Sequence, residues 1–468
     1  MKPETLALPL NVDGRGARVA VLVYNDAQND ARVLKEAASL AEAGAHVRIF
    51  AVSNLRQERP AGRVNIHGLE AQRVREFLWA DLLPPPVASY LKSTPGKAWT
   101  ASDTAEQAQA RPGSSPARSA EPGPARPTTS IVGAVKKQAM KVALECARRS
   151  YGPARLTGWW ARLVGEVRQF NPDIIHANDA NTLLPAAFIA RGRGTPIIYD
   201  SHELWLHRNV RQDRVLAPYV EAGIERLGIK RAAGVITVSE SIATWLQDRY
   251  ALATRPTLVR NIPQTATVEA GGRLRELAGL AGDDVVLAYS GRITTSRGIE
   301  EALAALPLLD DTHLVLLGYG EDGYIATLRR IATDNGVADR FHIVGPLPSH
   351  EVSAALSDAD MAIVHVKPKV LSYRFALPNK LFEAIHAGLP VVASDLPDIA
   401  RIVTTWGVGE VFNGESPTDL AAAVERVTAG RDRYRDAARV AARELTWEKE
   451  AEKLVEAYSR ALSRVTQP

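Results

Sequence analysis

Cysteine is almost absent from this chain of 468 residues, because Cys146 is the only one. A single cysteine excludes a disulfide framework and a cysteine-rich metal site, and it fits a reducing compartment. Neither sign of charge is in large excess: 57 Lys and Arg residues against 53 Asp and Glu residues leave a formal net charge of +4. So small a balance argues against a dedicated nucleic-acid-binding protein.

Long apolar runs are also missing. No run approaches the roughly 18 residues of a transmembrane helix, and residues 1–16 lack the apolar segment of a signal peptide. We therefore expect a cytoplasmic protein. Hydrophobic residues make up 46% of the chain and charged residues 24%, which is ordinary for a soluble globular protein. The length predicts two or three domains.

Short apolar segments alternate with longer amphipathic ones along most of the chain. Residues 17–52 run strand, helix, glycine, strand, which is the βαβ unit of a parallel sheet. Further strands are expected at residues 173–177, 196–200, 234–238, 257–260, 285–290, 313–317, 341–344, 361–366 and 390–393. Continuous apolar runs of this kind predict strands that are covered on both faces. We predict an α/β fold of two doubly wound domains, joined near residue 268.

One segment interrupts this pattern. Residues 83–130 hold nine of the 28 prolines, and such a composition buries too little apolar surface to order itself, so we expect a disordered insertion. Residues 131–150 then read as a helix with five cationic side chains, followed by Trp159 and Trp160. Two interpretations stay open: a solvated basic face beside core tryptophans, or a surface that docks reversibly on anionic lipid.

The first segment whose residues could form a binding site is Tyr289–Glu300. A strand ends there, Gly291 permits a tight turn, and Arg292 and Arg297 precede the next helix. Ligands of doubly wound sheets lie beyond the carboxyl ends of the strands, and the planar fork of arginine suits phosphate. The pattern indicates a diphosphate site, although two arginines on a surface loop would look the same.

The second segment is 377–394, where a loop leads into a short helix. Asn379 is a favoured N-cap, and Lys380 and Glu383 share one face of the helix. The first N–H groups of a helix can hold a phosphate, and a carboxylate one turn later can accept hydrogen bonds from a ribose diol. The alternatives are a carboxylate that complements the helix dipole, or a surface Lys380–Glu383 pair.

Polar residues also follow the expected strands of the first half. Asn29, Asp30 and Arg32 come after the first strand, and Asp179 and His202 follow two later strands. The strand residue His176 alone is more often a structural histidine than a catalyst. No H-E-x-x-H motif or cysteine pair accompanies these residues, so we expect no metal site.

Taken together, these segments resemble the family-4 retaining glycosyltransferases of the GT-B fold. The resemblance spans nearly the whole chain except 83–130, and rests on six segments in order: ARVLKEAASLAEAGAHVRIFA, HANDANTLLPAA, YDSHELW, ITVSESIATWL, YSGRITTSRGIEEAL and PNKLFEAIHAGLPVVAS. It implies two Rossmann-like domains that face a cleft. Residues 1–268 would form the acceptor-side domain and 269–445 the nucleotide-sugar domain, and 446–468 would be a helix returning to the first domain.

The resemblance also implies roles for individual residues. The residues expected to be catalytic are Arg292, Arg297, Asp179 and His202. Donor binding would involve Gly291, Gly345, Asn379, Lys380, Leu381 and Glu383, with the arginines on the diphosphate, Glu383 on the ribose, Gly345 near the base and Leu381 at the β-phosphate. Asn29, Asp30 and Arg32 would face the acceptor.

This chain departs from the family pattern at two places. Arg297 stands where the family usually has lysine. Members often carry a second glutamate, with seven residues between it and the ribose-binding one, and that position is Phe375 here. The missing carboxylate would help to hold the donor sugar, so the sugar is not predicted.

The resemblance implies an enzyme that transfers a hexosyl group from a nucleotide-sugar, its co-substrate, with retention of anomeric configuration and without a cofactor or metal. Its acceptor would be a sugar, a lipid-linked molecule or another small molecule of glycan or cell-envelope synthesis, and the enzyme would be cytoplasmic or peripheral on the inner membrane face. A nucleotide-sugar 2-epimerase or phosphorylase of related fold is the first alternative. A degenerate protein that only binds a nucleotide-sugar or a partner is the second.

Overall fold

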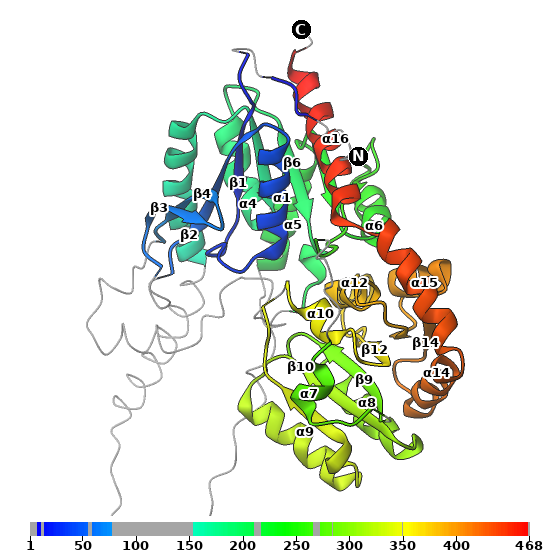
Figure 1. Cartoon of the computed structure of the whole chain (residues 1–468). Coiled ribbons are helices and arrows are strands. Elements are labelled where there is room, and N and C mark those ends of the chain that lie inside the picture. The colour runs from blue at the N-terminus through cyan, green and yellow to red at the C-terminus, as the bar shows by residue number, and fades with distance from the viewer. Residues whose placement is uncertain are drawn as a thin grey trace, which may run out of the picture.

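The computed structural model describes residues 7–10, 14–54, 59–76, 153–209, 217–264, 272–282, 284–348 and 350–466. Over these residues the chain forms two α/β domains, one above the other in Figure 1. The expected insertion at 83–130, the basic helix at 131–150 and the expected domain boundary near residue 268 lie outside the described residues.

The N-terminal domain is built on an eight-stranded sheet with the order β3-β4-β2-β1-β5-β6-β7-β8. The strands are β1 (Arg18–Leu22), β2 (His46–Val52), β3 (Gly62–Ile66), β4 (Leu69–Val74), β5 (Ile174–Asn178), β6 (Ile197–Ser201), β7 (Gly234–Thr237) and β8 (Thr257–Leu258). The helices are α1 (Ala31–Glu42), residues 153–170, α4 (Ala180–Ala190), η3 (Trp205–His207), α5 (Ala217–Ile229) and α6 (Glu240–Tyr250). All strand pairs are parallel except β3–β4.

Both faces of this sheet are covered, as the continuous apolar strands predict. One apolar cluster packs strand side chains against helix 153–170 and α4, and the other packs them against α1 and the C-terminal helix. Trp159 is fully buried in the first cluster, and the indole of Trp160 donates to the Asn181 carbonyl at 2.8 Å. Of the two interpretations left open, the structure supports the one with core tryptophans, because Trp159 lies inside the cluster and Trp160 is partly buried against it.

The β3–β4 hairpin was not expected from the sequence. Its turn places His67 at φ 50° and Gly68 at φ 87°, the left-handed pair that matches the twist of a two-residue hairpin. Its strands carry polar residues such as Arg63, Asn65 and Glu70 at alternate positions, so they lack the apolar runs that mark the other strands.

The C-terminal domain has a six-stranded parallel sheet with the order β11-β10-β9-β12-β13-β14. The strands are β9 (Val285–Ser290), β10 (Thr312–Leu317), β11 (Phe341–Val344), β12 (Met361–Val364), β13 (Val391–Ser394) and β14 (Gly409–Phe412). The helices are α7 (Leu274–Ala278), α8 (Ile299–Ala305), η4 (Leu306–Leu308), α9 (Asp322–Asp334), η5 (Ala338–Arg340), α10 (Val352–Leu356), α11 (Leu371–Arg374), α12 (Asn379–His386), α13 (Pro397–Trp406), α14 (Pro417–Ala429) and α15 (Arg431–Glu444).

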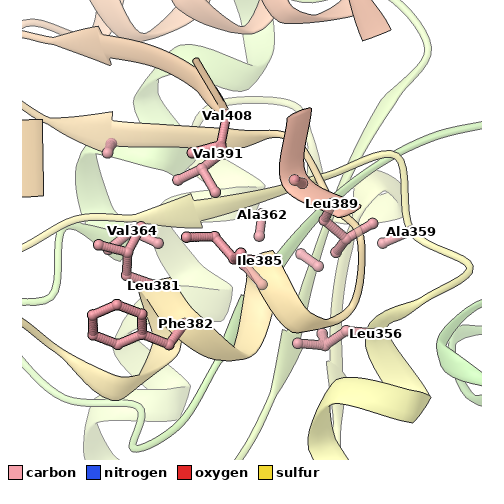
Figure 2. Packing of buried hydrophobic residues seen from close by; sticks show 14 of the residues in the cluster. Leu356, Ala359, Ala362, Val364, Leu381, Phe382, Ile385, Leu389, Val391 and Val408 are labelled. Carbon is pink, nitrogen blue, oxygen red and sulfur yellow. The ribbon is translucent and has the colours of Figure 1, made fainter. Parts of the chain in front are cut away.

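Helix α12 is anchored by its apolar face. Leu381, Phe382 and Ile385 point into the cluster around Val364 and Val391 of the neighbouring strands (Figure 2). This packing fixes the start of α12 beside the carboxyl end of β9, where the expected donor-binding residues lie.

The last helix, α16 (Trp447–Thr466), leaves the C-terminal domain and runs along the N-terminal one (Figure 1). Its residues Leu454, Val455 and Tyr458 are buried in the N-terminal cluster that also contains α1. The Trp447 indole donates to the Ser39 hydroxyl at 2.9 Å. The first domain is thus discontinuous in sequence. None of the described helices is long and apolar enough to cross a membrane.

Candidate functional site

The loop after β9 has a backbone that only small residues allow. Gly291 (φ 109°) and Gly298 (φ 70°) lie in the left-handed region, and a Cβ at Gly298 would be 1.7 Å from the His365 ring. This tight path leaves Arg292 and Arg297 half-buried at the carboxyl end of the sheet. The Tyr289 hydroxyl donates to the Arg292 carbonyl at 2.6 Å and holds the loop in place.

The start of α12 brings a third cation to the same edge. The Lys380 side chain is buried, with 9% of its surface exposed, and its amino group has no hydrogen-bond partner among the residues that the structure describes. It lies 3.6 Å from the centre of the Tyr289 ring. Burial, together with the nearby Arg297 charge, holds the pKa of Lys380 well below its usual value. Lys380 and Glu383 therefore do not form the surface ion pair that was one alternative.

The carboxylate of Glu383 completes this group. Its Oε2 accepts a hydrogen bond from the Ser290 hydroxyl at 2.9 Å, and burial raises the pKa of Glu383. Lys380 thus lies near the Arg297 charge and next to a carboxylate, and among the described residues no anion is hydrogen-bonded to its amino group. Burying a charge without a partner is costly, so an anionic ligand at this place would relieve the cost.

The structure corrects two details of the donor prediction. Asn379 is the first residue of α12 rather than its cap, since the N-cap position is Pro378 and no side chain caps the helix. Leu381 is fully buried in the core, and its N–H donates to the Pro378 carbonyl at 3.1 Å. The expected contact of Leu381 with a β-phosphate therefore has no support. Gly345 lies exposed after β11.

The three residues predicted to face the acceptor have different surroundings in the structure. Arg32 is buried and forms a fork to Asp200 at 2.9 and 3.0 Å, while also donating to the Val259 carbonyl at 2.7 Å. It is an internal ion-pair residue, so its expected contact with an acceptor is wrong. Asp30 caps α1, because its carboxylate accepts from the Val33 N–H at 3.2 Å. Asn29 is exposed at the loop.

Asp179 and His202 lie near each other at the carboxyl ends of β5 and β6. His202 Nε2 is 2.6 Å from Asp200 Oδ2. Burial alone would lower the pKa of His202, but the carboxylates of Asp200 and Asp179 raise it to about 10. Asp179 adopts φ 61° without capping α4, and burial raises the pKa of its carboxyl group. Such a strained residue at a strand end is typical of a functional site.

Behind His202 lies a buried group that could be mistaken for a metal centre. His176 Nε2 is 3.5 Å from Glu36 and 3.6 Å from Asp200, and the three ligand atoms lie within 4.8 Å of one another. The Arg32 guanidinium, however, is 2.9 Å from both carboxylates. Its positive charge already pairs with both carboxylates, so this donor set does not fit a further cation.

Lys35 was missed by the sequence analysis, although it links α1 to the segment after β8 and to the start of α16. Its ammonium donates to the side chain of Asn261 at 2.8 Å and to the Ile262 carbonyl, and lies 4.5 Å from the Trp447 ring. Burial and the neighbouring Arg32 lower the pKa of Lys35 to about 7. No sequence signal shows these contacts, because they join α1 to residues that come more than two hundred positions later.

Phe375 also has an inter-domain role. Its side chain packs against the apolar core of the N-terminal domain, and its carbonyl accepts from the Ser239 hydroxyl at 2.9 Å. The Ser241 N–H donates to Asp398 Oδ1 at 3.3 Å beside it. The position that would carry a second glutamate in the family is thus a docking contact between the domains.

Comparison with known proteins agrees with this geometry. Residues 273–445 match the family model of glycosyl transferases group 1, and residues 135–262 match that of glycosyltransferase family 4. The chain belongs to the family-4 glycosyltransferases. Glycosyl transfer is the activity that both family models name.

Several curated glycosyltransferases are similar in sequence. A D-inositol 3-phosphate glycosyltransferase of Geodermatophilus obscurus is 28% identical over 332 residues, which cover 66% of this chain and 72% of that protein. A 2-deoxystreptamine glucosyltransferase of Streptomyces kanamyceticus is 30% identical over 223 residues, or 46% and 56% of the two chains. A phosphatidyl-myo-inositol mannosyltransferase of Mycobacterium leprae is 26% identical over 61% of this chain and 73% of its own.

Solved structures confirm the GT-B fold. Sucrose-phosphate synthase from Thermosynechococcus elongatus superposes with a TM-score of 0.62 at 16% identity, covering 96% of this chain and 98% of the other. Anabaena HepE in complex with UDP-glucose gives a TM-score of 0.61 at 15% identity, covering 94% and 98%. Two facing Rossmann-like domains are therefore the architecture of this glycosyltransferase.

Proposed function

We propose that this glycosyltransferase moves a hexosyl group from a nucleotide-sugar to a hydroxyl group of its acceptor with retention of configuration, in glycan, glycolipid or cell-envelope synthesis. The observation that carries the proposal is the buried amino group of Lys380, which lies near the Arg297 charge and has no hydrogen-bond partner among the described residues. A nucleotide diphosphate supplies the anion that these cations lack. Glu383, fixed by Ser290, then accepts hydrogen bonds from the ribose.

The chemistry of the donor side is electrostatic. The bond between the anomeric carbon and the phosphate oxygen breaks, and its electron pair goes to the departing diphosphate. Arg292, Arg297 and Lys380 stabilise that charge, and Lys380, whose pKa is held low in the free protein, takes up a proton beside the phosphate. The Arg292 loop is held by Tyr289 and the start of α12 by its apolar core, which preorganises both cations.

Retention follows if the acceptor oxygen attacks the face that the leaving group vacates. The acceptor proton must then go to a base on that face. His202 is a poor base at neutral pH, because Asp200 and Asp179 keep its imidazole protonated, with a pKa of about 10. The departing phosphate takes the proton instead, and His202 donates a hydrogen bond to a sugar hydroxyl. Asp179 accepts one at the same edge.

The acceptor is proposed to be a polyhydroxylated molecule on the N-terminal side, as the names of the relatives suggest: inositol phosphate, deoxystreptamine and phosphatidylinositol. A lipid-linked acceptor would agree with reversible docking of a cytoplasmic enzyme on an anionic inner membrane face. With Trp159 and Trp160 held by the fold, only the cationic residues of 131–150 support that docking. Sedimentation with anionic and neutral vesicles tests it: no preference for anionic vesicles at low salt would leave a soluble acceptor.

Two other functions would use a related fold: a nucleotide-sugar 2-epimerase, and a protein that binds a nucleotide-sugar without turnover. Phe375 and Arg297 differ from the family pattern, and this difference favours a protein that binds a nucleotide-sugar without turnover. One experiment separates all three. The protein is incubated with a panel of nucleotide-sugars, and the products are identified by mass and by NMR. Release of nucleotide diphosphate with the sugar joined to water or to an acceptor hydroxyl supports transfer, an epimerised sugar supports the epimerase, and calorimetric binding without any product supports the binding protein.

A further inference from the structure

A chain of buried polar contacts leads from the C-terminal helix to the acceptor-side edge. The Tyr458 hydroxyl of α16 is 2.6 Å from His176 Nδ1, and both side chains have 0% exposure. His176 Nε2 is 3.6 Å from Asp200 Oδ2, and that same oxygen is 2.6 Å from His202 Nε2. Three elements, α16, β5 and β6, are therefore linked through neighbouring polar atoms.

The geometry decides which ring nitrogen of His176 carries the proton. Nε2 faces two carboxylates, Glu36 at 3.5 Å and Asp200 at 3.6 Å, so a lone pair there would be repelled. An N–H group at Nε2 suits this place beside Asp200, and Nδ1 then accepts the hydrogen bond of the Tyr458 hydroxyl. Burial and the nearby carboxylates raise the pKa of Tyr458 well above its usual value, so its hydroxyl stays a donor.

The groups around this chain come from every element that packs against it. They are Asp30, Arg32 and Glu36 from the start of α1, Asp179 before α4, Glu203 and Arg208 on either side of η3, His176 from β5, and Tyr458 from α16. The Arg32 fork holds the Asp200 carboxylate at 2.9 and 3.0 Å, His176 Nε2 lies 3.6 Å from it, and the same carboxylate contacts His202 at 2.6 Å.

We propose that Tyr458 is a positioning residue for His202: its hydroxyl sets the tautomer of His176, which holds Asp200 in the orientation that aims the His202 ring at the sugar. Because Tyr458 lies on the helix that returns from the C-terminal domain, the acceptor-side edge is complete only when α16 is docked. The inference rests on the proposed role of His202, whereas the contact chain itself can be tested without any activity.

The test compares the wild-type chain with Tyr458→Phe, which removes only the hydroxyl. Proton–nitrogen correlation spectra of protein labelled at its ten histidines report the tautomer and charge of each ring, and His176→Gln and His202→Gln assign the two signals. In the wild type, we expect His176 protonated at Nε2 and His202 doubly protonated at pH 8. In Tyr458→Phe, the signals of both rings shift. Turnover falls about tenfold with an unchanged KM for the nucleotide-sugar, which corresponds to about 1.4 kcal/mol in the barrier.

A double-mutant cycle separates this role from a purely structural one. His176→Gln keeps an N–H donor toward the carboxylates without needing the tyrosine, so Tyr458→Phe should have no further effect on kcat in that background. Tyr250→Phe is the matched control, because it removes another buried hydroxyl of the same domain, bonded to Glu225 at 2.8 Å. It should leave kcat and the His202 signals unchanged.

Two results would overturn the inference. One is a Tyr458→Phe protein whose melting temperature falls while the His202 signals and kcat stay as in the wild type. The other is an additive effect of Tyr458→Phe and His176→Gln on kcat. If the wild type turns over no nucleotide-sugar, the proposed function fails instead. The histidine spectra then still decide whether Tyr458 acts on His202.

Discussion

Replacing Lys380 by methionine should weaken donor binding while leaving the fold as stable or more stable. Methionine replaces the aliphatic stem of the lysine with a side chain of similar bulk and removes the ammonium, together with its contact with the Tyr289 ring. In the free protein that group is buried, lacks a hydrogen-bond partner among the described residues and lies near Arg297, so it costs folding free energy. With a diphosphate bound, the same group makes a charge-assisted hydrogen bond.

Such a bond contributes about 1.5–3 kcal/mol. Because every 1.4 kcal/mol is tenfold in affinity, Lys380→Met should raise the Kd for a nucleoside diphosphate by about 10- to 150-fold. Binding should also take up protons in the wild type, since the pKa of Lys380 is held low in the free protein and must rise beside phosphate. Affinity therefore falls as pH rises, and Lys380→Met removes this contribution.

The assay is titration calorimetry with UDP, GDP and ADP in buffers of different ionisation heat, alongside thermal unfolding. Lys453→Met is the matched control, because its ammonium pairs with Glu450 at 2.7 Å on α16, away from the proposed donor site. Unchanged affinity in Lys380→Met would refute the donor site. A parallel loss of melting temperature and affinity would show that Lys380 serves the fold instead.

Three further predictions test other parts of the account. Arg292→Ala should lose about 2–4 kcal/mol of transition-state stabilisation, measured as kcat/KM, and an unchanged value would remove Arg292 from the site. Deleting residues 84–129 should leave melting temperature and donor affinity intact, because a sequence so rich in proline supplies little core; a large drop in melting temperature would contradict this. His202 has its pKa raised from 6.5 to about 10, so its contribution to stability is full below pH 6.5 and is lost as pH rises through 10. Urea unfolding between pH 7 and 10 should therefore show a steeper loss in the wild type than in His202→Gln, and equal slopes would mean that the ion pair does not form.

The alternation of strands and helices could be predicted from the sequence, because parallel strands that are covered on both faces have continuous apolar runs. The expected segments at residues 46–52, 285–290 and 341–344 coincide with β2, β9 and β11. The β3–β4 hairpin was not predicted, because its residues alternate between polar and apolar. Strand β14 was not predicted either, because Gly409 and Glu410 interrupt its apolar pattern.

The candidate site was predictable where one local motif carries it and not where distant segments meet. The glycine loop with Arg292, and Glu383 one turn into α12, follow from local spacing. The capture of Arg32 by Asp200 does not, because these residues are 168 positions apart and only the sheet brings them together. The contact of Tyr458 with His176 spans 282 positions for the same reason.

The central claim, transfer of a sugar with retention from a diphosphate donor held by Lys380, Arg297 and Arg292, is tested most directly by the anomeric configuration of the first product. The enzyme is mixed with the α-linked nucleotide-sugar that it turns over and an acceptor such as inositol phosphate, and anomeric proton couplings are recorded from the first turnovers. The account predicts an α-linked product, formed in step with released nucleotide diphosphate. A β-linked product, or release of diphosphate that Lys380→Met and Arg292→Ala leave unchanged, would contradict it.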